Sequence, residues 1–232
     1  MPIVSTPASP TPYVDDGEEL MLVLRDFLSA TLNLQKDKKS NDHLYLQAIE
    51  RNSDSALKLL KQMPVAKEAV FEFFNLVIEL LVDEELCKNS HHVSRSLLNS
   101  LEKLHATLME LIKHPKLGPN WSPLIVFWVM EVLGDMSSKN LRSKNQLNED
   151  LSTWLSLKSG SKLVEIASAC MTQLDESSTE NCISHLLDSS VRHGASFDWV
   201  VAHIGGCFPE VVITRVLSVG LKSQDESAKI SR

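Results

Sequence analysis

The sequence predicts an all-α fold of stacked antiparallel helical hairpins, resembling an α-solenoid. Apolar residues recur at helical spacing in one segment after another. Only 8 glycines and 9 prolines occur among 232 residues, which leaves few of the turns that a sheet protein needs. Prolines and short polar runs separate the segments, so neighbouring helices should be antiparallel. We find no sequence repeat of fixed period, so a HEAT- or armadillo-type repeat would be visible only in the geometry.

Residues 1–16 are rich in Pro, Ser and Thr and predict a disordered N-terminal tail. The N-terminal helical region then spans residues 17–136. A polar cluster at 52–55 predicts a break in its second helix. Proline at the first helical position favours helix starts at Pro64 and at Ser122-Pro123. The predicted helices of this region are 17–34, 42–63, 64–82, 90–114 and 122–136.

Residues 137–145 lose helical periodicity and predict a polar linker loop. The C-terminal helical region follows at 146–221, and 222–232 form a polar tail. Ser196 is the expected N-cap of one short helix, and Gly205-Gly206 its expected end. The predicted helices of this region are 147–157, 161–174, 179–191, 197–204 and 209–221.

The composition is that of a soluble globular protein, with 43% hydrophobic and 23% charged residues. A net charge of −7 argues against broad binding to nucleic acid, which needs clustered cations. No stretch has the plan of a signal peptide, and no run approaches the roughly 18 apolar residues of a membrane span. The 4 cysteines form no CxxC pair and indicate reduced thiols in an intracellular protein.

Three patterns raise the question of catalysis or metal binding. Asp83-Glu84-Glu85 are consecutive on a helix, so their carboxylates point in different directions and cannot converge. Cys182 with His185, and His203 with Cys207, have spacings that could supply zinc ligands, but such pairs are frequent by chance on helices. Cys207 has no recognisable base, and phosphate-binding loops and GxSxG are absent. We therefore predict no enzyme activity, no cofactor and no metal.

Large aromatic residues gather in the C-terminal half. We expect most of them to pack between helices, although a buried tryptophan can also anchor a partner interface. The candidate anchors for either role are Phe197, Asp198, Trp199, His203, Phe208, Arg215, Trp121 and Trp128.

The stretch FDWVVAHIG at 197–205, followed by FP and then ITRVLSVGLK at 213–222, resembles the N-terminal region of Integrator complex subunit five. The resemblance continues more loosely through 121–138 and 147–174. It implies a non-catalytic scaffold in the nucleus, with other Integrator subunits as partners and RNA polymerase II reached indirectly. The implied process is 3′-end processing of small nuclear RNA and attenuation of transcription, with the nuclease and phosphatase chemistry belonging to other subunits. Family members are much longer, so the chain is expected to be a fragment or a truncated form.

Two other classes of function remain as alternatives. A nucleic-acid-binding helical repeat protein could use the cations of the predicted linker, Lys139, Arg142 and Lys144, although three cations in a loop usually only solvate it. A helical hydrolase would need a convergent site that the sequence does not contain. Direct contact with nucleic acid is thus not expected.

Overall fold

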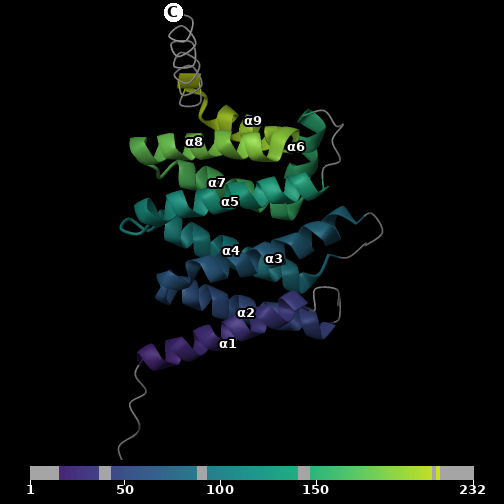
Figure 1. The fold of residues 1–232 in the computed structure, drawn as a ribbon, viewed down its shortest axis with the longest axis vertical. Coiled ribbons are helices and arrows are strands. Elements are labelled where there is room, and N and C mark those ends of the chain that lie inside the picture. The colour runs from purple at the N-terminus through teal and green to yellow at the C-terminus, as the bar shows by residue number, and fades with distance from the viewer. Residues whose placement is uncertain (1–15, 37–42, 88–92, 141–146, 211–212, 215–232) are drawn as a thin grey trace, which may run out of the picture.

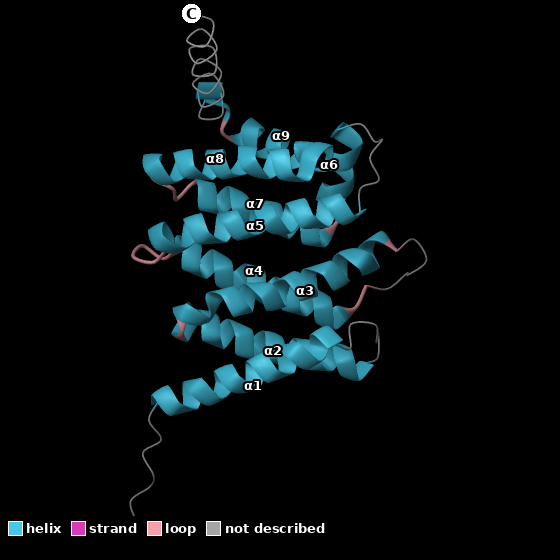
Figure 2. Cartoon of the chain, viewed as in Figure 1, coloured by secondary structure: helices cyan, strands magenta, loops and turns pink. Residues whose placement is uncertain are grey.

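The computed structural model describes residues 16–36, 43–87, 93–140, 147–210 and 213–214. Within these ranges every regular element is a helix and no strand occurs (Figure 2). The α-helices are α1 (Asp16–Lys36), α2 (His43–Gln62), α3 (Lys67–Leu86), α4 (Arg95–Lys113), α5 (Gly118–Asn140), α6 (Leu147–Ser156), α7 (Lys158–Met171), α8 (Glu176–His193) and α9 (Asp198–Cys207). Short 3-10 helices, η1 (Pro64–Ala66) and η2 (Gly194–Phe197), lead into α3 and α9.

The helices lie across the long axis of the molecule in successive layers, with α1 at one end and α8 and α9 at the other (Figure 1). α1 packs on α2, α2 on α3 and α4, α4 on α5 and α7, and α5 on α7 and α8. Each helix thus contacts the layers before and after it, as in a solenoid. The predicted all-α fold of stacked antiparallel helices is confirmed.

One hydrophobic core runs through the whole stack. α3 lies in its middle and is apolar around most of its circumference. Seven of its side chains are completely buried: Val70, Phe73, Phe74, Val77, Ile78, Leu81 and Val82. On its other side, Phe71 stacks on Trp128 of α5 with ring centroids 4.6 Å apart, and the Trp128 indole donates to Asn75 Oδ1 at 2.7 Å. These contacts hold α5 against α3.

The predicted break in α2 at 52–55 is wrong, because the helix is continuous through this cluster. Asn52 and Ser53 are buried and find polar partners on neighbouring helices. Asn52 Nδ2 donates to Thr31 Oγ1 of α1 at 2.9 Å, and the hydroxyls of Ser53 and Ser100 of α4 lie 2.9 Å apart. The polar residues that predicted a break in the helix therefore make hydrogen bonds between helices.

α5 begins at Gly118, earlier than the predicted start at Ser122-Pro123. A Cβ at Gly118 would collide with the carbonyl group of Ile112 in α4, so only glycine permits this tight turn. Pro119 then occupies the first turn, where the missing N–H costs nothing, and Pro123 lies inside the helix.

α5 also extends past its predicted end, so residues 137–140 of the expected linker are helical. Ser137 is fully buried, and the Lys139 ammonium lies 3.1 Å from Glu79 of α3. The rest of the expected linker, residues 141–145, lies outside the described residues, and α6 begins at Leu147 as predicted. The predicted tails likewise lie outside the described residues, apart from Asp16 in α1.

α7 and α8 appear in the predicted order but with shifted ends. α8 starts at Glu176, not at the predicted 179, because the Asp175 side chain caps it by accepting from Ser178 N at 2.7 Å. The helix ends at His193 and is followed by Gly194, whose φ of 62° favours glycine. α7 covers Lys158–Met171 in place of the predicted 161–174.

Two details predicted for α9 are wrong. Ser196 does not cap it, because its hydroxyl donates backwards to the carbonyl of His193 at 2.9 Å. The helix continues through Gly205-Gly206 and ends at Cys207. Of the predicted helix 209–221, residues 209–210 and 213–214 are helical, and the remainder lies outside the described residues.

Candidate functional site

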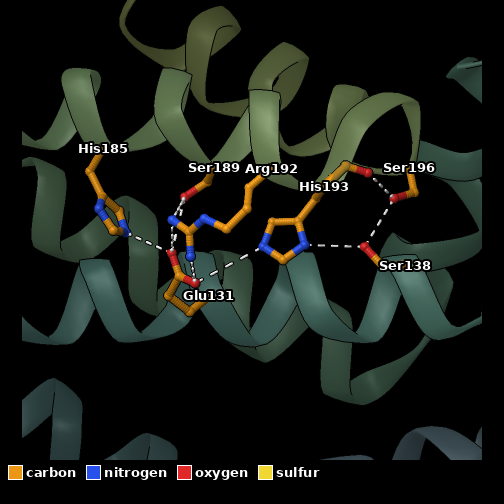
Figure 3. A network of polar contacts seen from close by, with 7 residues as sticks. All are labelled: Glu131, Ser138, His185, Ser189, Arg192, His193 and Ser196. Carbon is orange, nitrogen blue, oxygen red and sulfur yellow. Dashed lines mark hydrogen bonds and ion pairs between the residues drawn. The ribbon is translucent and has the colours of Figure 1, made fainter.

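A cluster of polar contacts lies between α5 and α8 and is centred on Glu131 (Figure 3). Arg192 binds the carboxylate with both terminal nitrogens, at 2.5 Å to Oε2 and 3.0 Å to Oε1. Ser189 donates to Oε1 at 3.0 Å. His185 Nε2 lies 3.0 Å from Oε1 but off the hydrogen-bond direction. One acid of α5 thus holds three residues on one face of α8.

A second group of polar contacts continues from His193 towards the end of α5. The imidazole Nε2 lies 4.0 Å from Glu131 Oε2, and Nδ1 lies 3.2 Å from Ser138 Oγ. The Ser138 hydroxyl also contacts Ser196 Oγ at 3.2 Å. The ring rests on Gly134, where a Cβ would come within 2.5 Å of it. Glycine therefore permits the close approach of the two helices.

The ionised form of Glu131 is stabilised by the side chains around it. Burial opposes ionisation, but hydrogen bonds from Arg192 and Ser189 and the charges of Arg192 and His185 outweigh it, so the pKa of Glu131 is lowered. A half-buried carboxylate with a bidentate arginine is a strong charge-assisted pair. Its effect is to hold α8 against α5.

Ser138, His193 and Glu131 superficially resemble a catalytic triad. A working triad needs the acid bound to the imidazole and donors aimed at the developing oxyanion. Here the carboxylate is engaged by Arg192, and His193 stays 4.0 Å away from it. Ser138 lies in the last turn of α5, where unpaired carbonyls repel negative charge. This geometry fits a structural contact that joins α5 to α8, and it does not fit catalysis of acyl transfer.

The acidic run at the end of α3 serves the starts of two later helices. Glu84 Oε2 accepts from the backbone N–H of Ser94, which precedes α4, at 2.7 Å. Glu85 accepts from the N–H groups of Lys158 and Ser159 at 2.8 and 3.2 Å. α7 has no cap of its own, so Glu85 supplies the missing acceptor.

Four of the candidate aromatic anchors pack within the stack. Trp121, Phe197 and Trp199 are at most 6% exposed, and Trp128 is half-buried against α3. Trp199 of α9 stacks on Trp154 of α6 with ring centroids 5.6 Å apart and donates to Ser137 Oγ at 2.9 Å. Their side chains thus contribute to internal packing.

The other candidate anchors lie nearer the surface. Asp198 is exposed, whereas His203 and Phe208 are half-buried. Burial lowers the pKa of His203. Phe208 packs against the core at the end of α9, and Arg215 lies outside the described residues. Whether any of the candidate anchors meets a partner stays a prediction.

Two of the four possible zinc ligands, Cys182 and His185, make contacts elsewhere. Cys182 is fully buried with its sulfur 3.2 Å from that of Met171, whereas His185 turns to Glu131. Among the described residues, no group of three or more His, Cys, Asp or Glu side chains could hold a metal ion. Nor does any helix in the described part of the chain have the length and apolarity to cross a membrane.

The model for the Integrator complex subunit 5 N-terminus matches residues 19–225. The chain belongs to this family. It is 32% identical over 189 residues to Integrator complex subunit 5 of Mus musculus, and 29% identical over 184 residues to that of Drosophila melanogaster. Each match covers 72% of this chain but only 19% and 18% of the two relatives, respectively. The chain therefore spans about a fifth of the curated relatives, and the predicted resemblance to the Integrator family is confirmed.

Sequence reasoning missed the Glu131 cluster in this member of the Integrator family. Two signals were available. Glu131 is an isolated charge in an otherwise apolar segment of α5, and His185, Ser189 and Arg192 recur at helical spacing on α8. The sequence alone does not pair the two sets, because some sixty residues separate them.

Proposed function

We propose that this chain is a non-catalytic scaffold element of the nuclear Integrator complex. It would support 3′-end processing of small nuclear RNA and attenuation of transcription by RNA polymerase II through contacts with other Integrator subunits. The observation that carries the proposal is the family match over residues 19–225, which covers almost the whole described stack. Stacked helices offer extended surfaces to proteins, and the principal polar cluster here braces helices against each other.

The first test is recovery of a tagged chain from nuclear extract, with co-purifying proteins identified by mass spectrometry. We expect several other Integrator subunits. A Trp199→Ala chain is the comparison variant, because the loss of this fully buried side chain should destabilise the helical stack and lower the recovery of partners. If a wild-type chain with a helical circular dichroism spectrum recovers no Integrator subunit, the proposal fails.

A second test uses competition in cells. A short chain that occupies partner surfaces without the rest of the subunit should displace the intact subunit, so overexpression should raise the level of unprocessed small nuclear RNA. The Trp199→Ala chain at equal expression should not. An unchanged level of unprocessed transcript with the wild-type chain would contradict a role in this process.

The alternative is direct binding to nucleic acid. Of its three candidate cations, Lys139 is paired with Glu79, and Arg142 and Lys144 lie outside the described residues. Binding of the chain to short RNA at low and moderate salt separates the two functions. An affinity that falls steeply with salt would favour nucleic acid.

A further inference from the structure

α1 carries two apolar stripes, of which only one packs on the rest of the stack. Phe27 and Leu34 belong to the inner stripe and are almost completely buried. The second stripe, which we call the outer stripe, lies on the flank of the helix. In it Met21 and Leu32 are each 57% exposed and Leu28 is 41% exposed. α1 is the outermost helix at its end of the molecule (Figure 1). The outermost helix of a stack usually has a polar outer surface, and α1 departs from this rule.

The outer stripe has the spacing of a coiled-coil seam. Positions 21, 25, 28 and 32 alternate steps of four and three residues, which keeps them on one line along the helix. Arg25 occupies one of these positions, and Glu18 precedes Met21 at the same spacing. The Arg25 guanidinium lies 3.6 Å from Asp26, with both side chains about three-quarters exposed, so this ion pair holds Arg25 only weakly.

The charges on the stripe argue against a second copy of the chain as its occupant. A parallel pairing in register would place Arg25 against Arg25 and Glu18 against Glu18. An antiparallel pairing centred on the stripe would place Arg25 against Leu28, which buries a cation without a counter-charge. A shift that pairs Arg25 with Glu18 leaves Leu28 and Leu32 outside the contact. Complementarity thus requires a different helix, with a carboxylate opposite Arg25.

We propose that the outer stripe of α1 (Glu18, Met21, Arg25, Leu28 and Leu32) binds an amphipathic helix of another Integrator subunit. The partner helix has apolar residues at coiled-coil spacing and an Asp or Glu opposite Arg25. This inference rests on the proposed function, because it assigns one surface through which the chain would join the assembly.

The test places a photoreactive amino acid at Leu28 of the tagged chain and irradiates it in nuclear extract. Asn33, exposed on a different side of the same helix, is the matched control position. Mass spectrometry should find Leu28 joined to a segment of another Integrator subunit that has the apolar spacing and a nearby carboxylate, with no such product from Asn33. Arg25→Glu should lower recovery of that subunit at least about tenfold, Arg25→Lys should retain most of it, and Lys at the partner carboxylate should restore binding to Arg25→Glu.

Several outcomes would overturn the inference. These are crosslinks from Leu28 to a second copy, to the same chain or to a segment without a carboxylate, and equal recovery with Arg25→Glu. If Integrator subunits co-purify but Leu28 gives no crosslink, the α1 surface is wrong and the proposed function stands. If no Integrator subunit co-purifies, the proposed function fails and the inference fails with it.

Discussion

The close approach of α5 and α8 at Gly134 gives the sharpest quantitative prediction. Alanine in place of a helical glycine normally stabilises a helix by about 1 kcal/mol. Here the added Cβ would lie 2.5 Å from the His193 ring, so the ring or the helix must move. Overpacking of this kind costs about 1–3 kcal/mol. We therefore expect Gly134→Ala to lower the free energy of unfolding by about 1 kcal/mol, opposite in sign to its effect on helix propensity.

The sign should reverse when the ring is absent. In a His193→Ala background, Gly134→Ala meets no imidazole and should raise the free energy of unfolding by about 1 kcal/mol. The coupling between the two sites is then about 2 kcal/mol, well above the few tenths expected for independent sites.

Urea denaturation of the four chains, followed by far-ultraviolet circular dichroism, measures this cycle. A Gly134→Ala chain more stable than wild type, with additive effects in the double variant, would refute the placement of His193 on Gly134.

Three further predictions concern the pH dependence, the packing and the thiol accessibility of the stack. Because the pKa of Glu131 is lowered from an ordinary 4.5, its contribution to stability is present above that pH and is lost as pH falls through the lower folded-state value. Acid titration of unfolding should therefore show a weaker dependence on pH in Glu131→Gln, and an identical dependence would contradict the pairing. Trp199→Ala should cost about 3–5 kcal/mol in urea denaturation, and a loss below about 1 kcal/mol would mean that α9 is not packed as described. In a Cys207→Ser background, maleimide at neutral pH should label exposed Cys87 and spare Cys170 and Cys182, because both thiols are buried and burial raises their pKa, that of Cys182 to about 12. Rapid labelling of all three thiols in the folded chain would contradict this packing.

The order of the helices was predictable because each helix has its own apolar stripe, and the helical spacing of that stripe is visible in the sequence of the segment alone. α3 shows this well, since its buried residues follow the predicted pattern through to Val82. The errors at α2 have the opposite origin. Asn52 and Ser53 read as a break because their partners, Thr31 and Ser100, belong to other helices. The local sequence shows that a residue is polar, but it does not show which group on another helix is its hydrogen-bond partner.

The candidate site was less predictable for the same reason. The aromatic positions were predicted as anchors for either packing or a partner, and the choice between these two roles depends on neighbours such as Trp154 and Ser137. Glu131 depends on residues far along the chain, on α8. The start of α5 at Gly118 depended on how closely the backbone of α4 approaches.

The two buried polar contacts of α2 have a consequence for alignment. Leucine-rich surfaces of neighbouring helices look similar after a slide of one turn, about 5.4 Å, so apolar packing alone defines the axial position poorly. Such a slide would separate Asn52 from Thr31 on one side and Ser53 from Ser100 on the other. Both serine hydroxyls also bond to carbonyls of their own helices, so the buried Asn52 amide is the group left unpaired, which costs about 1–3 kcal/mol. The two polar contacts of α2 therefore favour one axial position of α2 relative to α1 and one relative to α4.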